Sequence, residues 1–391
     1  MIRVIQWATG GVGRAAIETI LDHPELELAG AWVHSAEKDG TDLGTLVGRD
    51  PIGVTASTDA AALLATDADC VLYSPLMADG KTLRAILASG KNVVTPLGWF
   101  YPDAKQRERY DALCREHGVT LHGTGIHPGG ITEKIPLALT ALSGSVTSVR
   151  AEEFSDIRTY AAPDVVRYWM KFGGTPEEAT SSGTADALGS GYRQSVRLIA
   201  DALGFDLDPE LRVTHEAAVA TAPIDSPIGV IEPGRVAAQR LRWQGTVAGE
   251  PVITAAVNWF MGEAALDPPW EFGAAGERYE IEIAGDPGSF TTIAGMHAHA
   301  QDERASTNAD TAAAARERTP GSSDGTPAPG ASRAVERHPG IVATAAHCVN
   351  SIPYVVAADP GVRTYLDLPL TAGRAAPHLH RAHRSDRSPA R

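Results

Sequence analysis

The chain has 391 residues, of which 43% are hydrophobic and 21% are charged, a composition typical of a globular protein with room for two domains. Its formal net charge of −14 disfavours nucleic acids and anionic membrane surfaces as partners. Three widely spaced cysteines, with neither a membrane-length apolar run nor a secretory leader, lead us to expect a cytoplasmic protein without disulfides that acts on a small-molecule substrate.

The first expected element is a buried strand that runs directly into a glycine-rich turn. Residues 2–7 (IRVIQW) form an apolar run without proline or glycine, and a helical pattern follows that stops before Pro24. Between them, the dinucleotide fingerprint G-x-G-x-x-G is matched with alanine at its first position. The turn and the free N–H groups of the helix start therefore predict binding of NADP or NAD, with an ordinary strand-to-helix turn as the alternative. The residues concerned are Thr9, Gly10, Gly11, Val12 and Gly13.

A second strand, expected over residues 26–33, ends where NAD-binding folds carry an acidic residue for the ribose hydroxyls. Here the strand is followed by His34, Ser35 and Lys38. Because a hydroxyl and a cation suit a 2′-phosphate, the sequence favours NADP over NAD. The alternative is a solvated turn, with the adenosine bound elsewhere.

Strands and helices continue to alternate up to residue 123. We expect strands near Val54 and at 69–74, 92–95 and 119–122, with helices at 60–64 and 80–89 and a third ending at Gly118. This alternation predicts an α/β fold class, with a Rossmann-type, doubly wound parallel sheet and helices on both faces. Ligands of such sheets lie beyond the carboxyl ends of the strands. These ends add the cofactor-binding candidates Ser74, Pro75, Thr95, Thr124 and Gly125.

The pattern changes after Ser143, where strands follow one another directly. Strand-like runs are found at 146–154, 212–220, 236–247, 252–260 and 278–283, and a long amphipathic helix is expected over 184–203. Short connections such as Ala248–Pro251 resemble hairpin turns. We therefore expect a second α+β domain built on a mostly antiparallel sheet.

These patterns divide the chain into five segments. We expect a dinucleotide-binding domain over 1–143 and a domain for substrate binding and dimerisation over 144–300. Residues 301–337 contain Val335 as their only apolar residue besides alanines, which predicts a disordered low-complexity insertion. Residues 338–372 should close the fold, with a helix at 339–352 packed on the first domain, and the basic tail at 373–391 should be flexible.

Several local sequences resemble the dihydrodipicolinate reductase-like superfamily. They are ATGGVGR at 8–14, LYSP at 72–75, GKNVVT at 90–95 and GTGIHPG at 123–129. Through YEIEIAG at 279–285 and HPGIVATAAHCVNSIP at 338–353, the chain is most similar to the branch of 2,4-diaminopentanoate dehydrogenases and native amine dehydrogenases, particularly its actinobacterial members. The resemblance implies hydride exchange between NAD(P)H and a C=N carbon, and a homodimer formed by the second domain.

The chain departs from this family at two places. Dihydrodipicolinate reductases carry His-His-x-x-x-Lys where residues 153–158 read EFSDIR, so we do not expect their reaction, although SGTA at 182–185 resembles their carboxylate-binding run. Amine dehydrogenases of this branch carry a glutamate after GKNVVT, whereas residues 96–101 read PLGWFY. Three functions therefore stay open. They are amine dehydrogenase-like chemistry on a small, fairly apolar substrate, ketone or imine reduction on the same fold, and a catalytically weak cofactor-binding sensor.

Hydride transfer needs a proton donor or acceptor beside the substrate, and the sequence offers three candidates. His127 can change charge near neutral pH, but a histidine that only hydrogen-bonds the backbone fits equally well. Asp156 and Tyr168 belong, with Glu153, to the first polar cluster of the second domain, where salt bridges at a hinge are the alternative.

The substrate-binding candidates are Trp99, Phe100, Arg158, Tyr160 and Thr184. The aromatic triplet at 99–101 would form an apolar wall or, alternatively, pack as a helix cap. The histidines at 297, 299, 338 and 347 and the neighbouring Cys348 lack the compact spacing of a zinc site, so we expect no metal.

Overall fold

The computed structural model describes residues 1–160, 162–273, 277–296 and 338–379. The chain forms two compact units, Met1–Gly125 with Thr344–Arg391, and Ile126–Ala343. The expected insertion at 301–337, the end of the expected flexible tail, and His297 and His299 lie outside the described residues.

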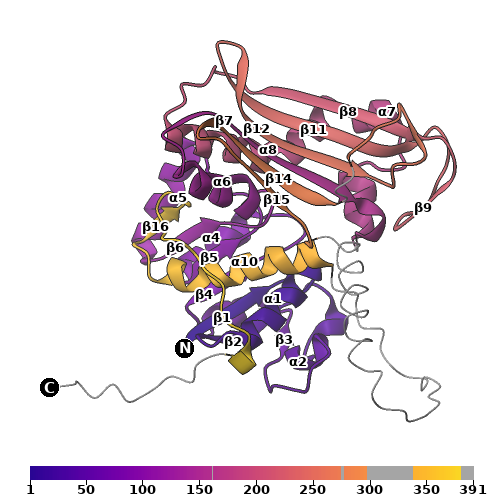
Figure 1. Ribbon diagram of the computed structural model, residues 1–391. Coiled ribbons are helices and arrows are strands. Elements are labelled where there is room, and N and C mark those ends of the chain that lie inside the picture. Colours follow the sequence, from indigo (N-terminus) through magenta and orange to yellow (C-terminus); the bar gives the residue numbers. More distant parts are fainter. Residues whose placement is uncertain (161, 274–276, 297–337, 380–391) are drawn as a thin grey trace, which may run out of the picture. The chain divides into compact units, whose positions relative to one another are not determined.

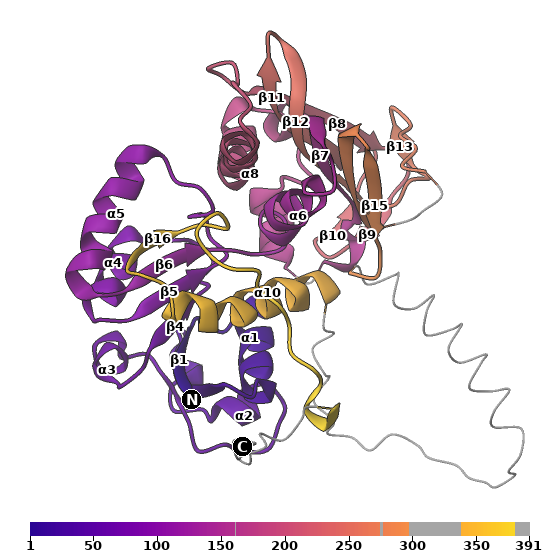
Figure 2. The same cartoon turned by 60° about the vertical axis from the view of Figure 1, so that its left-hand side comes forward.

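The first unit is a seven-stranded parallel sheet in the order β16-β6-β5-β4-β1-β2-β3. In Figure 2, α3, α4 and α5 lie on one face of this sheet, and α1 and α10 lie on the other. The Rossmann-type sheet expected from the sequence is therefore confirmed. The strands are β1 (Ile2–Trp7), β2 (Leu26–Trp32), β3 (Ala56–Ser57), β4 (Cys70–Tyr73), β5 (Asn92–Thr95), β6 (Thr120–Gly123) and β16 (Gly361–Arg363). The helices are α1 (Gly11–Asp22), α2 (Leu43–Leu46), α3 (Ala60–Ala65), α4 (Gly80–Ala88), α5 (Ala104–His117) and α10 (Pro339–Val356), with the short 3-10 turns η1 (Ala36–Lys38) and η5 (Pro377–Leu379).

Two strands of this sheet differ from the expectation. The short strand expected near Val54 is β3 at Ala56–Ser57, and β16 extends the sheet beyond β6 although its sequence gave no strand signal. A three-residue strand is too short for an alternating pattern to reveal it. Asp111 of α5 accepts a hydrogen bond from the Val362 N–H at 2.7 Å, and Val362 is completely buried. Tertiary packing therefore places β16.

The second unit is built on a seven-stranded sheet in the order β13-β8-β11-β12-β7-β14-β15 (Figure 1). The β7–β12 pair is parallel and the other pairs are antiparallel, as expected for a mostly antiparallel sheet. The β11–β12 connection turns at Ala248 and Gly249, whose φ angles of 51° and 82° fit a tight hairpin. The strands are β7 (Ser145–Asp156), β8 (Arg212–Ala220), β11 (Val236–Val247), β12 (Glu250–Phe260), β13 (Leu266–Asp267), β14 (Arg278–Asp286) and β15 (Ser289–Ile293), beside a separate hairpin of β9 (Ile224–Ser226) and β10 (Gly229–Ile231).

The second unit also contains several helical segments. They are η2 (Gly130–Lys134), α6 (Ile135–Thr140), η3 (Ile157–Thr159), η4 (Val165–Trp169), α7 (Pro176–Ala179) and α8 (Ser182–Leu203). Ile131 is buried in the core of this unit, and Ile135 and Leu137 pack against that core. Because η2 and α6 belong to this core, the first unit ends at Gly125, before the domain boundary that the sequence suggests at 143. In the described part of the chain, no helix is both long and apolar enough to cross a membrane.

The alternation of strand β7 places its two neighbouring glutamates on opposite faces of the sheet, with side chains that are 9% (Glu152) and 12% (Glu153) exposed. Val149 and Ala151 are buried in the core of the unit, and Glu153 follows them on the same face. Its neighbour Glu152 lies on the opposite face, where Arg150 contacts it at 2.6 Å. Adjacent glutamates on one strand thus have different surroundings.

Candidate functional site

The glycine-rich turn of the first unit has the geometry that a dinucleotide requires. Ala8, at the first fingerprint position, has a φ of 77°, a left-handed conformation that glycine adopts more easily. A Cβ atom added to Gly13 would lie 2.1 Å from the carbonyl oxygen of Ala8, so close packing of helix on strand requires glycine there. A Cβ added to Gly10 meets nothing within 4 Å, which leaves room beside the start of α1 for a pyrophosphate.

A buried glutamine ties this turn to the next strand end. The Nε2 group of Gln6, which is completely buried, donates to the Ala8 carbonyl at 2.9 Å and to the Ser74 hydroxyl at 2.8 Å. The N–H of Ser74 also donates to the Trp7 carbonyl at 3.1 Å. The structure therefore brings the predicted residues Ser74 and Pro75 to the edge of the sheet that holds the glycine-rich turn.

The segment after β2 also approaches the turn. Lys38, at the end of η1, places its Nζ 3.5 Å from the Thr9 hydroxyl. Ser35 precedes η1, and the ring of His34 contacts that of Trp32 edge-on at 6.2 Å. The Lys38 ammonium therefore lies beside the glycine-rich turn, and Ser35 lies at the start of the same 3-10 turn.

Thr95 and Thr124 are buried at the ends of β5 and β6. The Thr95 hydroxyl accepts the Leu97 N–H at 3.1 Å, and the Thr124 hydroxyl contacts His347 Nδ1 at 2.9 Å and the hydroxyl of Tyr365. His347 Nδ1 also lies 2.8 Å from the Gly125 carbonyl. The carboxyl-terminal segment therefore builds this edge of the sheet, a contribution that reading the first 143 residues alone does not reveal.

The two aromatic candidates of the first unit are packed within it. Phe100 is 2% exposed, and the ring of Trp99 lies 4.2 Å from that of Tyr110. Trp99 has a φ of 64°, and its backbone passes so close to β6 that a Cβ on Gly123 would lie 2.3 Å from the Trp99 carbonyl carbon. These contacts describe a packed loop, and the role of this loop as a substrate wall stays a prediction.

The second unit holds a buried acid surrounded by aromatic side chains, which we call the Glu153 cluster. Its members are Glu153, His127, Tyr160, Tyr192, Tyr279 and Trp259. Glu153 Oε2 lies 3.9 Å from His127 Nε2, and their side chains are 12% and 1% exposed. The ring of His127 lies between Tyr192 at 5.1 Å and Tyr279 at 5.5 Å. The cluster thus combines side chains from five separate segments of the chain.

These surroundings change the acidity of Glu153. Burial raises its pKa from 4.5 to about 8, a hydrogen bond from the Trp259 indole lowers it, and the charge of Glu277 raises it further. Burial and the nearby Glu153 charge also raise the pKa of Tyr160, Tyr192 and Tyr279. The raised pKa of Glu153 favours its protonated form near neutral pH, a property that suits a general acid or base.

A second buried glutamate holds the loop that carries His127. Glu133 accepts a hydrogen bond from the Gly129 N–H at 2.6 Å, and the hydroxyls of Thr132 and Ser195 also donate to it. Burial raises its pKa to about 7, while these three hydrogen bonds lower it. The Tyr192 hydroxyl donates to the His127 carbonyl at 3.1 Å. Helix α8 therefore fixes the loop at two points, through Tyr192 and Ser195.

Asp156 and Arg158 lie at the end of β7 and form an ion pair with each other. Arg158 Nε contacts both carboxylate oxygens of Asp156, at 3.0 and 2.9 Å, and Glu277 accepts the Asp156 N–H at 2.8 Å. The Arg158 side chain is 45% exposed, whereas Asp156 is buried. This is the salt bridge that the sequence left open as an alternative, and a direct catalytic role for Asp156 stays a prediction.

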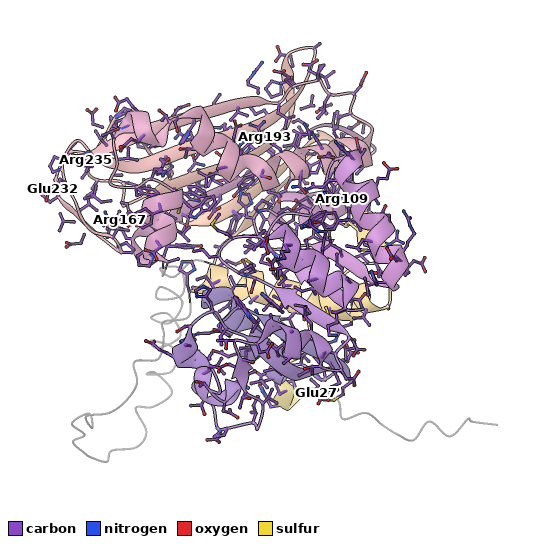
Figure 3. The ribbon with its side chains drawn as sticks, turned by 180° about the vertical axis from the view of Figure 1, so that it is seen from behind. Glu27, Arg109, Arg167, Arg193, Glu232 and Arg235 are labelled. Atoms are coloured by element: carbon purple, nitrogen blue, oxygen red, sulfur yellow. The ribbon has the colours of Figure 1, made fainter. Side chains whose placement is uncertain are left out.

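Tyr168 and Thr184 belong to a different part of the second unit. Tyr168 is 63% exposed, and both residues line a pocket of about 850 Å³ together with Lys171 and Arg167, which Figure 3 labels. Tyr160, in contrast, belongs to the Glu153 cluster and contacts His338 edge-on at 5.4 Å. Of the predicted substrate residues of this unit, Tyr160 belongs to the Glu153 cluster, Thr184 lines the pocket, and Arg158 forms its ion pair with Asp156.

Sequence reasoning named Glu153 in a polar cluster without giving it a role, and it missed Tyr192, Tyr279 and Glu133. Tyr279 carried a usable signal, since it precedes Ile281 and Ile283 on the buried face of the alternating run at 278–283. Tyr192 and Glu133 carried none, because their importance depends on contacts with residues far away in sequence. Among the described residues, no group of three or more His, Cys, Asp and Glu side chains is arranged to hold a metal ion.

Comparisons with known proteins cover both units. The model of the 2,4-diaminopentanoate dehydrogenase C-terminal domain matches residues 131–287 and 324–382, and that of the dihydrodipicolinate reductase N-terminus matches residues 3–120. An amine dehydrogenase from Streptomyces virginiae is 29% identical over 383 residues, 95% of this chain and 97% of the relative. A 2,4-diaminopentanoate dehydrogenase from Acetoanaerobium sticklandii is 26% identical over 276 residues, 69% of this chain and 64% of the relative. The structure of an amine dehydrogenase from Mycobacterium smegmatis shares the fold, with a TM-score of 0.68 and 21% identity over 95% of this chain and 97% of that one.

Proposed function

The chain belongs to the 2,4-diaminopentanoate dehydrogenase family of NAD(P)-dependent oxidoreductases, and we propose that it interconverts a small, fairly apolar amine and the corresponding imine. The observation that carries the proposal is the Glu153–His127 pair, buried among aromatic side chains. Oxidation of an amine requires the loss of a proton from nitrogen and of a hydride from carbon. Glu153 and His127 are the pair that would exchange the proton, since both are buried and their side chains lie 3.9 Å apart.

The first unit would bind the nicotinamide cofactor, which supplies the hydride acceptor or donor when bound. Gly10 and the N–H groups at the start of α1 would hold the pyrophosphate, and Lys38 and Ser35 would hold the adenosine ribose. Because Lys38 can pair with a 2′-phosphate, we propose that NADP binds more tightly than NAD. A homodimer formed by the second unit completes the proposal.

One specific observation favours a second candidate, reduction of a ketone or preformed imine without ammonia. The segment Pro96–Tyr101 contains no acidic residue, although the resemblance leads us to expect a glutamate there. Glu153 offers a carboxyl group in the second unit instead, so we favour the amine reaction. A catalytically weak sensor stays as a third possibility.

The test is a panel of ketones, aldehydes and primary amines, assayed with NADPH and NADH and with ammonia present or absent. The proposal expects ketone-dependent oxidation of the reduced cofactor that requires ammonia, and amine-dependent reduction of the oxidised cofactor. Turnover that does not depend on ammonia would favour the second candidate, reduction of a ketone or preformed imine. Cofactor binding without turnover of any panel member would favour the sensor.

A further inference from the structure

Gln6 is a polar side chain on a buried strand of the first unit. It is completely buried, and its neighbours Ile5 and Trp7 belong to the core on the other face of the sheet. The Gln6 amide therefore faces the start of α1, where its Nε2 would lie 3.1 Å from a Cβ added to Gly13. Because Gln6 precedes the first position of the dinucleotide fingerprint, the fingerprint assigns it no role.

The orientation of this amide follows from the groups around it. Its Nε2 lies 2.9 Å from the Ala8 carbonyl, 3.2 Å from the Trp7 carbonyl and 2.8 Å from the Ser74 hydroxyl. A carbonyl oxygen can only accept a hydrogen bond, so the nitrogen must face the turn. The Oε1 of Gln6 is then buried where it accepts no hydrogen bond from the described part of the chain. Because an unsatisfied buried acceptor lowers stability, the contribution of this side chain lies in its donors.

These donors hold a backbone conformation that alanine rarely adopts. Ala8 has a φ of 77°, a value that favours glycine. Its N–H donates to the Trp32 carbonyl at 3.0 Å and its carbonyl accepts from Gln6, so both of its backbone polar groups are fixed. A trans peptide directs its C=O and its N–H to opposite sides. Because the Ala8 carbonyl points to Gln6, the Thr9 N–H points away from it.

We propose that Gln6 positions the Ala8–Thr9 peptide so that the Thr9 N–H binds the diphosphate of a dinucleotide together with the N–H groups at the start of α1. Helix α1 begins after Gly10 without a side-chain cap, so the N–H groups of its first turn have no acceptor within the helix. The inference rests on the proposed function and adds to it a positioning residue outside the fingerprint. Gln6 thereby compensates for the alanine at the first fingerprint position.

Affinity for the diphosphate should therefore depend on Gln6, whereas stability should not. Gln6→Met keeps an unbranched side chain of similar volume and removes the donors. NADPH, NADH and ADP share the diphosphate, so this change should weaken all three about tenfold and leave the ratio of NADPH to NADH affinity unchanged. The melting temperature of the cofactor-free chain should stay within a few degrees, because the change also removes the unsatisfied Oε1.

A second substitution distinguishes positioning from a general loss of structure. Glycine adopts a positive φ without the steric cost that alanine carries, so Ala8→Gly in the Gln6→Met background should raise the affinity again by about threefold. Ala8→Gly alone should have a smaller effect, because Gln6 already holds the conformation. The matched control is Gln239→Met, which replaces another completely buried glutamine, in the second unit, whose Nε2 donates to the Met170 carbonyl. This control should leave dinucleotide affinity unchanged.

The experiment is calorimetric titration of the full chain and these variants with NADPH, NADH and ADP, together with thermal unfolding of each cofactor-free protein. Undiminished affinity in Gln6→Met, a loss of affinity that Ala8→Gly does not restore, or an equal loss in Gln239→Met would each overturn the inference. If Gln6→Met does not fold, Gln6→Asn decides by the same titration, because it withdraws the amide from the turn by one methylene group.

Failure of the proposed function is recognised separately, because it is measured as absent turnover in the substrate panel. Weakened dinucleotide binding in Gln6→Met, restored by Ala8→Gly, with no turnover of any panel member would support the inference and contradict the proposed activity. Turnover in the unmodified chain with undiminished affinity in Gln6→Met would do the reverse. Absence of dinucleotide binding to the unmodified chain would overturn both.

Discussion

In the first unit the groups arranged for a ligand belong mainly to the backbone, whereas in the second unit they belong to side chains from separate elements. The N–H groups at the start of α1 and the space beside Gly10 come from one short segment. The Glu153 cluster, in contrast, needs β7, β12, β14, α8 and the loop before η2. The difference teaches that a cofactor turn can be built locally, while a group with a shifted pKa requires the whole core around it.

The largest expected effect is the loss of cofactor binding when a glycine of the turn is replaced, and two variants separate the binding role of Gly10 from the packing role of Gly13. Gly10→Val and Gly13→Val should each abolish cofactor binding, the first by filling space that a pyrophosphate needs. Gly13→Val should also destabilise the fold by roughly 1–3 kcal/mol, since its Cβ would lie 2.1 Å from the Ala8 carbonyl oxygen. Gly10→Val should melt like the unmodified chain, because a Cβ there meets nothing within 4 Å. Calorimetric titration with NADPH and NADH, together with thermal unfolding, measures both effects.

Undiminished cofactor affinity in both glycine variants would contradict the assignment of the turn. Equal melting temperatures for the two variants would contradict the close contact between Gly13 and Ala8.

The next effect concerns the second unit alone. His127→Asn should lower turnover by about 10²–10⁴-fold, the usual cost of removing a group that transfers protons. Cofactor affinity should remain, because the glycine-rich turn belongs to the other unit. Steady-state rates and cofactor titrations on the same preparation provide the comparison. Unchanged turnover would return His127 to a structural role and direct attention to Asp156 and Tyr168.

A smaller effect links the buried acids to stability. Glu133 and Glu153 keep their protons in the folded chain up to about pH 7 and 8, whereas the ordinary pKa of a glutamate is 4.5. Between about pH 5 and 8 the folded chain therefore binds more protons than the unfolded chain. The free energy of unfolding should fall by a few kcal/mol as the pH rises through this range. Carboxyl groups with a lowered pKa, such as Asp42 and Asp208, lose their contribution to the free energy of unfolding only below this pH range.

Urea unfolding at pH 5, 6, 7 and 8 measures this slope. Glu133→Gln and Glu153→Gln should each flatten it, and Glu152→Gln should leave it unchanged. A flat profile in the unmodified chain would show that the two acids do not carry raised pKa values in the folded state.

The smallest effect concerns the choice of cofactor. Ser35→Asp adds a carboxylate beside Lys38 and should repel a 2′-phosphate, so the ratio of NADPH to NADH affinity should fall about tenfold, equivalent to roughly 1.4 kcal/mol. Ser35→Ala is the control, since it removes the hydroxyl without adding charge. A preference for NADH in the unmodified chain would contradict the assignment of residues 34–38.

The amino-acid sequence by itself determined the features that depend on short-range patterns. The strand and glycine-rich turn at 2–13, the alternation of strands and helices up to 123 and the hairpin at 248–249 could all be predicted, as could membership of the family. Each is decided within a few residues by apolar periodicity and by the backbone freedom of glycine.

Only the tertiary structure decided what surrounds Glu153. His127, Tyr192 and Tyr279 are distant from it in sequence. Pairing of β14 with β7 and packing of α8 against β11, β12 and η2 bring them together. The same holds for β16, which pairs with β6 from the far end of the chain. The physical reason is that the pKa of a side chain depends on which distant segments exclude water from it. The partner of an edge strand likewise depends on which distant segment packs beside it, and no local sequence pattern encodes either choice.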